Sequence, residues 1–283
     1  MKPILKYGGG KTKEIPSFQS YLPNKYDTYY EPFFGGGALF FHLEPKLAVV
    51  NDVNQKLVGF YNEVATNYDE LRGELDDIQR IYEANRELFE QRRRLDPEVL
   101  IHDDNSDLYY AMRAMYNDKI SKEYSDAAIY FFINKTAYSG MTRYNRNGEF
   151  NVPYGHYKNL NTKLLTEEHS QLLGRTSIHN GDYLNMFDKM QSKDFVFLDP
   201  PYDCVFNDYG NEEFTGGFGE EHHKKLALDF RNLSGKAMMV IGCTPLIEGL
   251  YCNFIKARYN KVYGVNIRNR FKSKSQHLII TNY

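Results

Sequence analysis

The sequence predicts an α/β fold that is interrupted by a mainly helical insertion carrying a β-hairpin. Short apolar runs typical of buried strands alternate with helical patterns near both ends of the chain. The middle of the chain instead places apolar residues at three- and four-residue steps, as amphipathic helices do. The 283 residues, 42% hydrophobic and 25% charged, suffice for one large domain with such an insertion and exclude a disordered chain.

A βαβ unit is predicted near the N-terminus. An aromatic-rich run at 28–33 is expected to form a strand, and a buried run at 47–50 forms the next strand, which ends at Asn51 and Asp52. Three glycines follow the first strand, and the run 38–43 is expected to begin a helix.

The central part of the chain is predicted to be helical and then to change character. Pro97 ends the first and longest helical pattern. Residues 137–157 are rich in Gly, Asn, Tyr and Arg, and the step from Asn147 to Gly148 lies between extended runs, which predicts a hairpin. Helices are predicted over 57–95, 108–115 and 127–133.

After residue 165 the alternation of strands and helices resumes. We therefore predict a discontinuous α/β domain formed by residues 1–56 and 165–283, which encloses an inserted domain at 57–164. The apolar runs that predict the later strands lie at 195–198, 237–241 and 277–280.

The near-neutral total charge conceals a segregation of charge along the chain. The 35 Lys and Arg residues and 37 Asp and Glu residues give a formal net charge of −2. Residues 63–107 hold 14 acidic and 6 basic side chains, a balance of −8, whereas residues 249–283 hold 7 basic side chains and no acidic one. The basic segment is either a solvated surface or a surface that meets a polyanion.

The composition also favours a reduced, cytoplasmic protein. No run of 18 apolar residues predicts a transmembrane helix, and residues 1–6 lack the apolar core of a signal peptide. The three cysteines form no Cys-x-x-Cys pair, so we expect neither disulfides nor structural zinc. His222 and His223 are neighbours in a predicted helix and therefore point apart, so we expect both to be solvated and no metal to be bound.

A glycine-rich turn follows the first predicted strand. In the run 31–37, which reads Glu-Pro-Phe-Phe-Gly-Gly-Gly, the glycines let the backbone turn sharply and approach a ligand. Asp52 lies 21 residues after Glu31 at the end of the next strand, where a carboxylate accepts hydrogen bonds from ribose hydroxyls. The run is not Gly-x-Gly-x-x-Gly and no Walker lysine follows it, which disfavours dinucleotide and triphosphate ligands.

The tetrad Asp199-Pro200-Pro201-Tyr202 directly follows a predicted strand, at the edge where open α/β sheets bind ligands. The prolines fix the backbone, so the Asp199 carboxylate and the Pro200 carbonyl are fixed acceptors. Two acceptors beside the flat ring of Tyr202 suit an exocyclic amino group on a planar base. Holding both N–H groups favours a pyramidal nitrogen, which is able to attack an activated methyl group.

In this set of motifs the chain resembles the DNA adenine-N6 methyltransferases of the DNA adenine methylase (Dam) family, α-group. The likeness covers nearly the whole chain and includes the runs 5–11, 31–37, 51–54, 180–183 and the tetrad. It implies a Rossmann-like sheet, S-adenosylmethionine as cofactor, and an inserted target-recognition domain.

The resemblance also assigns residues to the cofactor and to catalysis. Tyr7 stands where the family usually has Trp, and it keeps an aromatic face. The catalytic residues implied are Asp199, Pro200 and Tyr202. The implied cofactor contacts are Tyr7, Lys11, Glu31, Phe33, Gly35, Gly37, Asp52, Asp182, Tyr183 and Asp199.

The hairpin at 137–157 resembles the family's DNA-entering hairpin. By position, Tyr138 matches an aromatic wedge and Arg143 matches a guanine-reading arginine. A bidentate contact from Arg143 to guanine O6 and N7 is worth about 1–3 kcal/mol of discrimination. Ser139 replaces the asparagine common in GATC methylases, although a GATC-like target is still favoured. The implied DNA contacts are Tyr138, Ser139, Met141, Arg143, Asn145 and Pro153.

The implied partner is double-stranded DNA, and the protein is expected to act as a monomer that does not bind a membrane. A cognate restriction endonuclease would act separately. Because adenine N6 is paired inside the duplex, the target base has to rotate out of the stack. Four basic residues of the C-terminal segment are expected to contact phosphates, namely Arg268, Arg270, Lys272 and Lys274.

Two other functions stay open from the residues alone. N4-cytosine methylation also needs an amino acceptor, but it more often uses a Ser-Pro-Pro-Tyr tetrad. A catalytically inactive DNA-binding module would not need an intact Asp199 and cofactor loop. C5-cytosine methylation is rejected, because it needs a Pro-Cys nucleophile and Cys204 follows Asp203.

Overall fold

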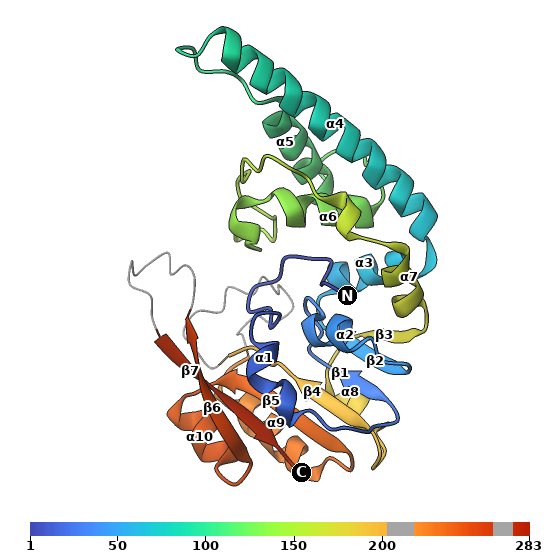
Figure 1. The fold of residues 1–283 in the computed structure, drawn as a ribbon, viewed down its shortest axis with the longest axis vertical. Coiled ribbons are helices and arrows are strands. Elements are labelled where there is room, and N and C mark those ends of the chain that lie inside the picture. The colour runs from blue at the N-terminus through green and yellow to red at the C-terminus, as the bar shows by residue number, and fades with distance from the viewer. Residues whose placement is uncertain (203–217, 263–273) are drawn as a thin grey trace. The chain divides into compact units, whose positions relative to one another are not determined.

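The computed structural model describes residues 1–202, 218–262 and 274–283, and these form two compact units (Figure 1). One unit contains residues 1–9 and 54–175. The other contains residues 10–53 together with the described residues from 176 to the end of the chain.

A seven-stranded sheet forms the second unit, with the strand order β3-β2-β1-β4-β5-β7-β6. The first five strands in this order are parallel to one another, and β7 runs antiparallel to both β5 and β6. The predicted α/β class is therefore confirmed. The strands are β1 (Tyr29–Glu31), β2 (Ala48–Asp52), β3 (Thr176–Asn180), β4 (Phe195–Leu198), β5 (Lys236–Gly242), β6 (Ile255–Val262) and β7 (Lys274–Thr281).

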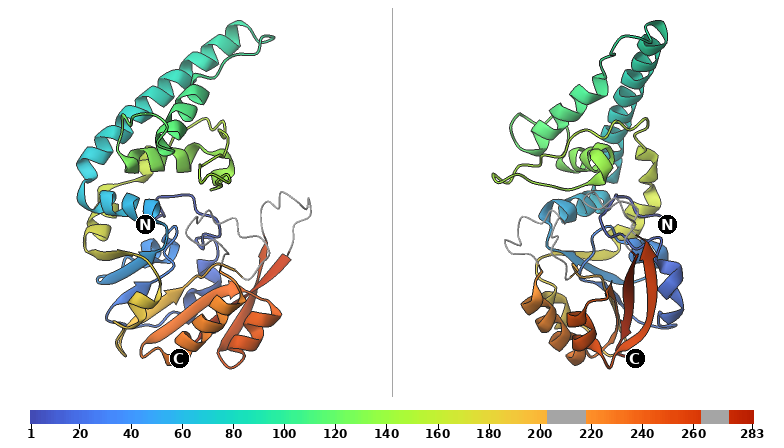
Figure 2. Two further views of the ribbon diagram at one scale, coloured as in Figure 1. Left: turned by 180° about the vertical axis from the view of Figure 1, so that it is seen from behind. Right: turned by 90° about the vertical axis from the view of Figure 1, so that its left-hand side faces the viewer.

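Helices cover both faces of this sheet (Figure 2). The helices α8 (Leu184–Phe187), α9 (Glu220–Asn232) and α10 (Pro245–Tyr251) contribute to an apolar core with side chains of β4, β5 and β7. On the other face, α1 (Ile15–Phe18) packs Phe18 against Phe197, with ring centroids 5.6 Å apart. α2 (Ala38–Leu43) packs Phe40 against Tyr29, with ring centroids 6.5 Å apart. A short 3₁₀ turn, η1 (Gln19–Tyr21), follows α1.

The first unit is mainly helical. The predicted helical stretch 57–95 is two helices that meet at Asn67, whose φ of −129° and ψ of 38° are not helical. The elements of this unit are α3 (Gln55–Thr66), α4 (Tyr68–Leu95), α5 (Asp104–Tyr116), α6 (Asp126–Thr136), η2 (Tyr138–Gly140), η3 (Thr162–Leu164) and α7 (Glu167–Gly174).

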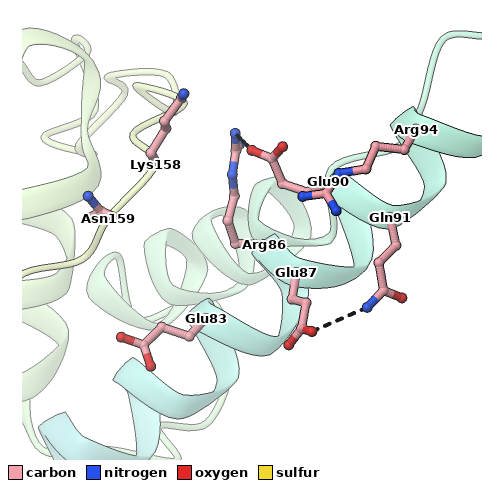
Figure 3. Close-up of a pocket in the computed structure, with 8 residues that line it drawn as sticks. All are labelled: Glu83, Arg86, Glu87, Glu90, Gln91, Arg94, Lys158 and Asn159. Atoms are coloured by element: carbon pink, nitrogen blue, oxygen red, sulfur yellow. Dashed lines mark hydrogen bonds and ion pairs between the residues drawn. The ribbon is translucent and has the colours of Figure 1, made fainter. Parts of the chain in front are cut away.

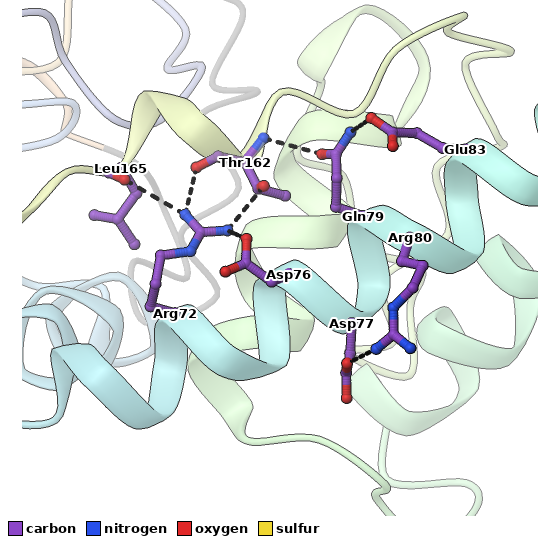
Figure 4. A network of polar contacts seen from close by, with 8 residues as sticks. All are labelled: Arg72, Asp76, Asp77, Gln79, Arg80, Glu83, Thr162 and Leu165. Carbon is purple, nitrogen blue, oxygen red and sulfur yellow. Dashed lines mark hydrogen bonds and ion pairs between the residues drawn. The ribbon is translucent and has the colours of Figure 1, made fainter.

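Arg72 of α4 anchors the segment that returns from the hairpin region to α7 (Figure 4). Its guanidinium donates to the Thr162 carbonyl at 2.8 Å, to the Thr162 hydroxyl at 2.9 Å and to the Leu165 carbonyl at 3.4 Å. It also pairs with Asp76 at 2.7 Å. One partly buried side chain thus fixes the segment after the hairpin onto the long helix.

The N-terminal residues pack with the helical unit, although the sequence suggested that they accompany the sheet. The Asn134 side chain accepts from the Lys6 amide at 2.8 Å and donates to the Lys6 carbonyl at 2.7 Å. Lys6 Nζ donates to the Lys135 carbonyl at 2.7 Å and lies 3.7 Å from the centroid of the Tyr157 ring. These bonds join residues far apart in sequence, so local patterns carry no sign of them.

No helix in the described part of the chain combines the length and apolar character needed to cross a membrane.

Candidate active site

The predicted loops meet at the carboxyl edge of the parallel strands. β1 lies between β2 and β4. From β1 the sheet continues through β2 and β3 on one side, and through β4 and β5 on the other, so the strand order reverses at β1. Such a reversal of strand order opens a crevice in which open α/β sheets bind ligands. The glycine loop follows β1, Asp52 ends β2, and the tetrad follows β4.

The glycine loop is held in shape by the two residues that end β2. The Gly35 amide donates to Asp52 Oδ2 at 2.8 Å, and the Asn51 side chain donates to the Pro32 carbonyl at 3.1 Å and to the Gly181 carbonyl at 2.8 Å. Gly37 has a φ of 61°, and a Cβ there would lie 2.7 Å from the Phe34 ring. Asn51 is a positioning residue missed by the sequence analysis, although it lies inside the motif 51–54.

Glu31 is buried below this loop and is only 2% exposed. It accepts a hydrogen bond from the Tyr29 hydroxyl at 2.7 Å. Burial raises the pKa of Glu31 to about 8, so its carboxyl group holds a proton at neutral pH. A neutral acid in this place is both a donor and an acceptor.

Lys11 and Asp199 form an ion pair at the tetrad. Lys11 Nζ lies 2.5 Å from Oδ1 and 2.6 Å from Oδ2 of Asp199. Lys11 is 2% exposed, whereas the Asp199 side chain keeps 21% of its surface. Burial raises the pKa of Asp199 above its ordinary value, and the charge of Lys11 opposes that shift. The pair therefore presents an oriented carboxylate that remains partly accessible.

Tyr202 completes the tetrad with a largely buried ring that is 9% exposed. Lys11 Nζ lies 5.1 Å from the centroid of this ring, so the same ammonium contacts the carboxylate and faces the aromatic side chain. Pro200, which lies between Asp199 and Tyr202 in the sequence, is buried. The structure thus brings Lys11, Asp199 and Tyr202 together.

Two further predicted cofactor residues lie on the loop after β3. Tyr183 packs its ring against Phe33 at 5.4 Å, and its hydroxyl donates to Asp229 Oδ2 at 2.8 Å. Asp182 is exposed and accepts from the Leu184 amide at 2.9 Å. Phe33 and Tyr183 therefore form one aromatic surface beside the glycine loop.

The predicted hairpin lies in the helical unit and is short and irregular. Antiparallel bridges join Ala137 to Tyr154 and Tyr144 to Phe150, on either side of a turn. The Asn145 side chain is engaged within that turn, where it accepts from the amides of Asn147 at 2.9 Å and Glu149 at 3.0 Å.

The other predicted DNA contacts of the hairpin are more accessible. Tyr138 is 52% exposed, and Ser139 next to it has a φ of 55°. Ser139, Arg143 and Pro153 are exposed and Met141 is partly exposed. The Pro153 carbonyl accepts from the Tyr138 amide at 2.9 Å.

Asn151 orients Arg143, a role that the sequence analysis missed. Arg143 Nε donates to Asn151 Oδ1 at 2.8 Å, and Nη2 donates to the Asn151 carbonyl at 3.3 Å. This contact engages the side edge of the guanidinium. The outer edge, with Nη1 and the second hydrogen of Nη2, faces away from Asn151.

Some predicted residues lie away from this site or outside the described residues, and one expectation is wrong. Tyr7 is partly exposed and belongs to the N-terminal segment that Asn134 holds, in the helical unit. His223 is buried against Phe218 with ring centroids 4.8 Å apart, so the expectation that both histidines are solvated is wrong for His223. Cys204 and the basic residues Arg268, Arg270 and Lys272 lie outside the described residues, as does the side chain of Lys274.

An open groove of about 290 Å³ lies along the distal half of α4 (Figure 3). Its walls carry both signs of charge, and Arg86 and Glu90 form an ion pair within it. Lys158 and Asn159 form the opposite wall. None of the predicted site residues lines this groove.

Comparison with known proteins identifies the family. A model described as D12 class N6 adenine-specific DNA methyltransferase matches residues 7–270. The chain belongs to this family. It is therefore a methyltransferase that acts on adenine N6 in DNA, and the alternatives of N4-cytosine methylation and an inactive DNA-binding module are set aside.

Individual relatives match the chain over most or all of their length. Type II methyltransferase M.CviBI of Paramecium bursaria Chlorella virus NC1A is 35% identical over 291 residues, which cover 100% of both chains. Type II methyltransferase M1.LlaDCHI of Lactococcus lactis subsp. cremoris is 32% identical and covers 100% of this methyltransferase and 96% of its own chain. Retron Ec67 DNA adenine methylase of Escherichia coli is 30% identical, with 90% and 82% covered.

Proposed function

We propose that this methyltransferase uses S-adenosylmethionine to methylate an adenine that has rotated out of a short duplex site. The observation that carries the proposal is the Lys11–Asp199 ion pair beside Tyr202, on the sheet edge that also holds the glycine loop and Asp52. This edge supplies acceptors for an amino group and a carboxylate suited to ribose hydroxyls.

The residues present fit S-adenosylmethionine. Asp52 is 6% exposed and is oriented by the Gly35 amide at a strand end, which is the place and chemistry for holding ribose hydroxyls. Phe33 and Tyr183 supply an aromatic surface for the adenine ring of the cofactor. When bound, S-adenosylmethionine supplies an electrophilic methyl group on a positively charged sulfur.

The tetrad holds the target amino group for reaction. Asp199 and the Pro200 carbonyl each accept one N6 hydrogen of adenine. Because each carboxylate oxygen has two acceptor sites, the contact with Lys11 is compatible with this second bond. Burial raises the pKa of Asp199, and the positive charge of Lys11 opposes that shift and so favours the ionised carboxylate.

Tyr202 stabilises the rotated base. Extraction of adenine from the duplex costs a few kcal/mol of pairing and stacking. Stacking on one aromatic ring recovers about 1–3 kcal/mol. In the helical unit, Tyr138 is exposed enough to enter the space that the base leaves.

The hairpin selects the site. Arg143 reads a guanine with the outer edge of its guanidinium, and we propose a GATC-like target with Ser139, Met141, Asn145 and Pro153 nearby in the contact. We further propose that the protein works as a cytoplasmic monomer, and that a restriction endonuclease with the same target would be a separate protein.

The experiment is to incubate the protein with methyl-labelled S-adenosylmethionine and genomic DNA, and then to analyse the nucleosides and sequence the product by single-molecule reads. Label in N6-methyladenine, confined to one short motif that contains GA, is expected. Absence of label from DNA when S-adenosylmethionine is the donor, or label scattered over all adenines, would overturn the proposed donor or the proposed site reading.

A further inference from the structure

Two buried polar side chains lie behind the tetrad, and the proposed chemistry does not use them. Glu14 is 6% exposed and His277 is fully buried, and His277 Nδ1 lies 2.8 Å from Glu14 Oε2. The imidazole packs edge-to-face against the ring of Tyr202, with centroids 5.2 Å apart and an interplanar angle of 87°.

The strands place His277 against Tyr202. His277 of β7 is opposite Gly242 of β5 in the antiparallel register. A Cβ added to Gly242 would lie 3.7 Å from Tyr202 Cδ2, so the ring lies next to this glycine. Tyr202 is therefore placed beside the end of β5, with the imidazole of His277 packed edge-to-face against it.

Glu14 is in turn held by β6. The Tyr259 hydroxyl donates to Oε2 at 2.6 Å and Lys261 Nζ donates to Oε1 at 2.6 Å. Burial by itself would raise the pKa of Glu14, but its hydrogen-bond donors and the nearby charge of Lys11 lower it to about 2. Glu14 is therefore a buried, ionised anchor whose oxygens accept from three side chains.

One turn of the chain connects this anchor to the ion pair of the tetrad. The amides of Glu14 and Ile15 both donate to the Lys11 carbonyl, at 2.7 and 3.0 Å. Lys11 reaches Asp199 from this turn, while Glu14 reaches His277. The turn thus fixes both members of the tetrad that the proposed function assigns to the adenine.

We propose that Glu14 and His277 are positioning residues, which fix the ring of Tyr202 in the orientation that stacks on the rotated adenine. This inference rests on the proposed function, because it acts through Tyr202. Neither residue is required to touch the base or the cofactor. Aromatic pairs prefer edge-to-face geometry, and misplacement of a reacting group by about 1 Å lowers rates by up to about 100-fold.

The test compares Glu14→Gln and His277→Phe with the wild-type enzyme. The first keeps the shape of the anchor and removes its charge, and the second keeps an aromatic edge against Tyr202 and removes the bond to Glu14. Glu248→Gln is the matched control, because Glu248 pairs with Arg258 of the same strand β6 at the surface. The measurements are kcat, KM for DNA, affinity for S-adenosylmethionine, the melting temperature, and the fluorescence of duplex DNA with 2-aminopurine at the target adenine.

We expect both variants to lose kcat by roughly 10-fold or more at a temperature where each is fully folded, with KM and cofactor affinity close to wild type. Their 2-aminopurine signal should change in the same direction as in Tyr202→Ala, whereas Glu248→Gln should match the wild type. Wild-type kcat and fluorescence in both variants would overturn the positioning role. A loss of kcat that only follows a fall in melting temperature would overturn it too. In either case, an impaired Tyr202→Ala would leave the proposed function standing. Wild-type behaviour of Tyr202→Ala would instead overturn the stacking role itself.

Discussion

Lys11 pairs with Asp199 of the tetrad. Its buried ammonium lies within 2.6 Å of both carboxylate oxygens. The resemblance to the Dam family suggests Lys11 as a cofactor contact, and the structure adds a second role. It supplies the positive charge that offsets the burial of the catalytic carboxylate.

We predict that Lys11→Met lowers kcat and moves the acid limb of its pH profile to higher pH. Without the ammonium, burial raises the pKa of Asp199 further, so the carboxylate is lost at a higher pH. The measurement is kcat between about pH 6 and pH 9 at saturating DNA and cofactor. Lys13→Met is the matched control, since Lys13 is exposed on the same turn. An acid limb that does not move would contradict this role.

Glu31 gives a prediction about stability. Its pKa in the folded protein is raised from 4.5 to about 8 by burial, so the folded state binds this proton more tightly than the unfolded chain does. Its contribution to stability is therefore full below about pH 4.5 and decreases as the pH rises to about 8. Glu31→Gln should gain stability relative to the wild type between pH 5 and pH 8. Thermal melting without cofactor checks this, and a difference in melting temperature that is constant with pH would speak against a protonated Glu31.

Sequence patterns identified most of the tetrad and the cofactor loop, because chemistry confines these residues to short motifs beside strands. They did not identify the residues that orient them. Asn51, Glu14 and His277 act across the sheet, and each partner lies far away in the sequence. A single polar residue in a strand looks the same whether it faces water or a buried carboxylate.

Within the hairpin, Asn151 holds Arg143, the residue proposed to read a guanine. Asn151 engages Nε and one side of Nη2 of Arg143, and the outer edge of the guanidinium remains for a bidentate contact with guanine. Asn145 instead stabilises the turn from within.

We predict that Arg143→Ala relaxes the choice of site more than it weakens nonspecific binding, and that Asn151→Ala does the same to a smaller degree. The expected loss for Arg143→Ala is about 1–3 kcal/mol of discrimination at one guanine. Rates on the cognate duplex and on duplexes with that guanine replaced measure the effect. Arg146→Ala, at an exposed arginine in the same turn, is the control. Equal weakening on all duplexes would make Arg143 a phosphate contact.

The elements were predicted unevenly from the sequence. Strands β4 and β5 are buried on both faces and read as continuous apolar runs, so their prediction is confirmed. Strand β6 has polar and basic residues along its length and was not predicted. Its order in the sheet comes from pairing with β7, and its Lys261 is stabilised by Glu14, a contact between distant parts of the sequence.

For the whole molecule, the basic C-terminal segment contributes less charge to the surface than its composition suggests. Lys261 is only partly exposed and pairs with Glu14, and Arg258 pairs with Glu248. Two of the seven basic residues from 249 onward are thus balanced within the sheet unit. The compact units also differ from the predicted domains, because long-range bonds attach residues 1–9 to the helical unit.

We predict that the salt dependence of DNA binding depends only on the basic residues of the C-terminal segment other than Arg258 and Lys261. Arg258→Gln should leave the slope of log K against log salt unchanged. Lys272→Gln should reduce the slope by about 0.9, as expected for the loss of one phosphate contact. Fluorescence anisotropy of a labelled duplex between about 50 and 200 mM salt provides the measurement. A reduced slope for Arg258→Gln would show that its pair with Glu248 opens on DNA.

The most direct test of the ion-paired tetrad as the catalytic centre is the single-turnover rate of methyl transfer by Asp199→Ala, measured together with its affinity for a cognate duplex. Because Asp199 is proposed to hold the N6 amino group and not the DNA backbone, transfer should be lost while the affinity stays near that of the wild type. Transfer at a rate close to wild type in this variant would contradict the assignment of Asp199 and of the centre built around it.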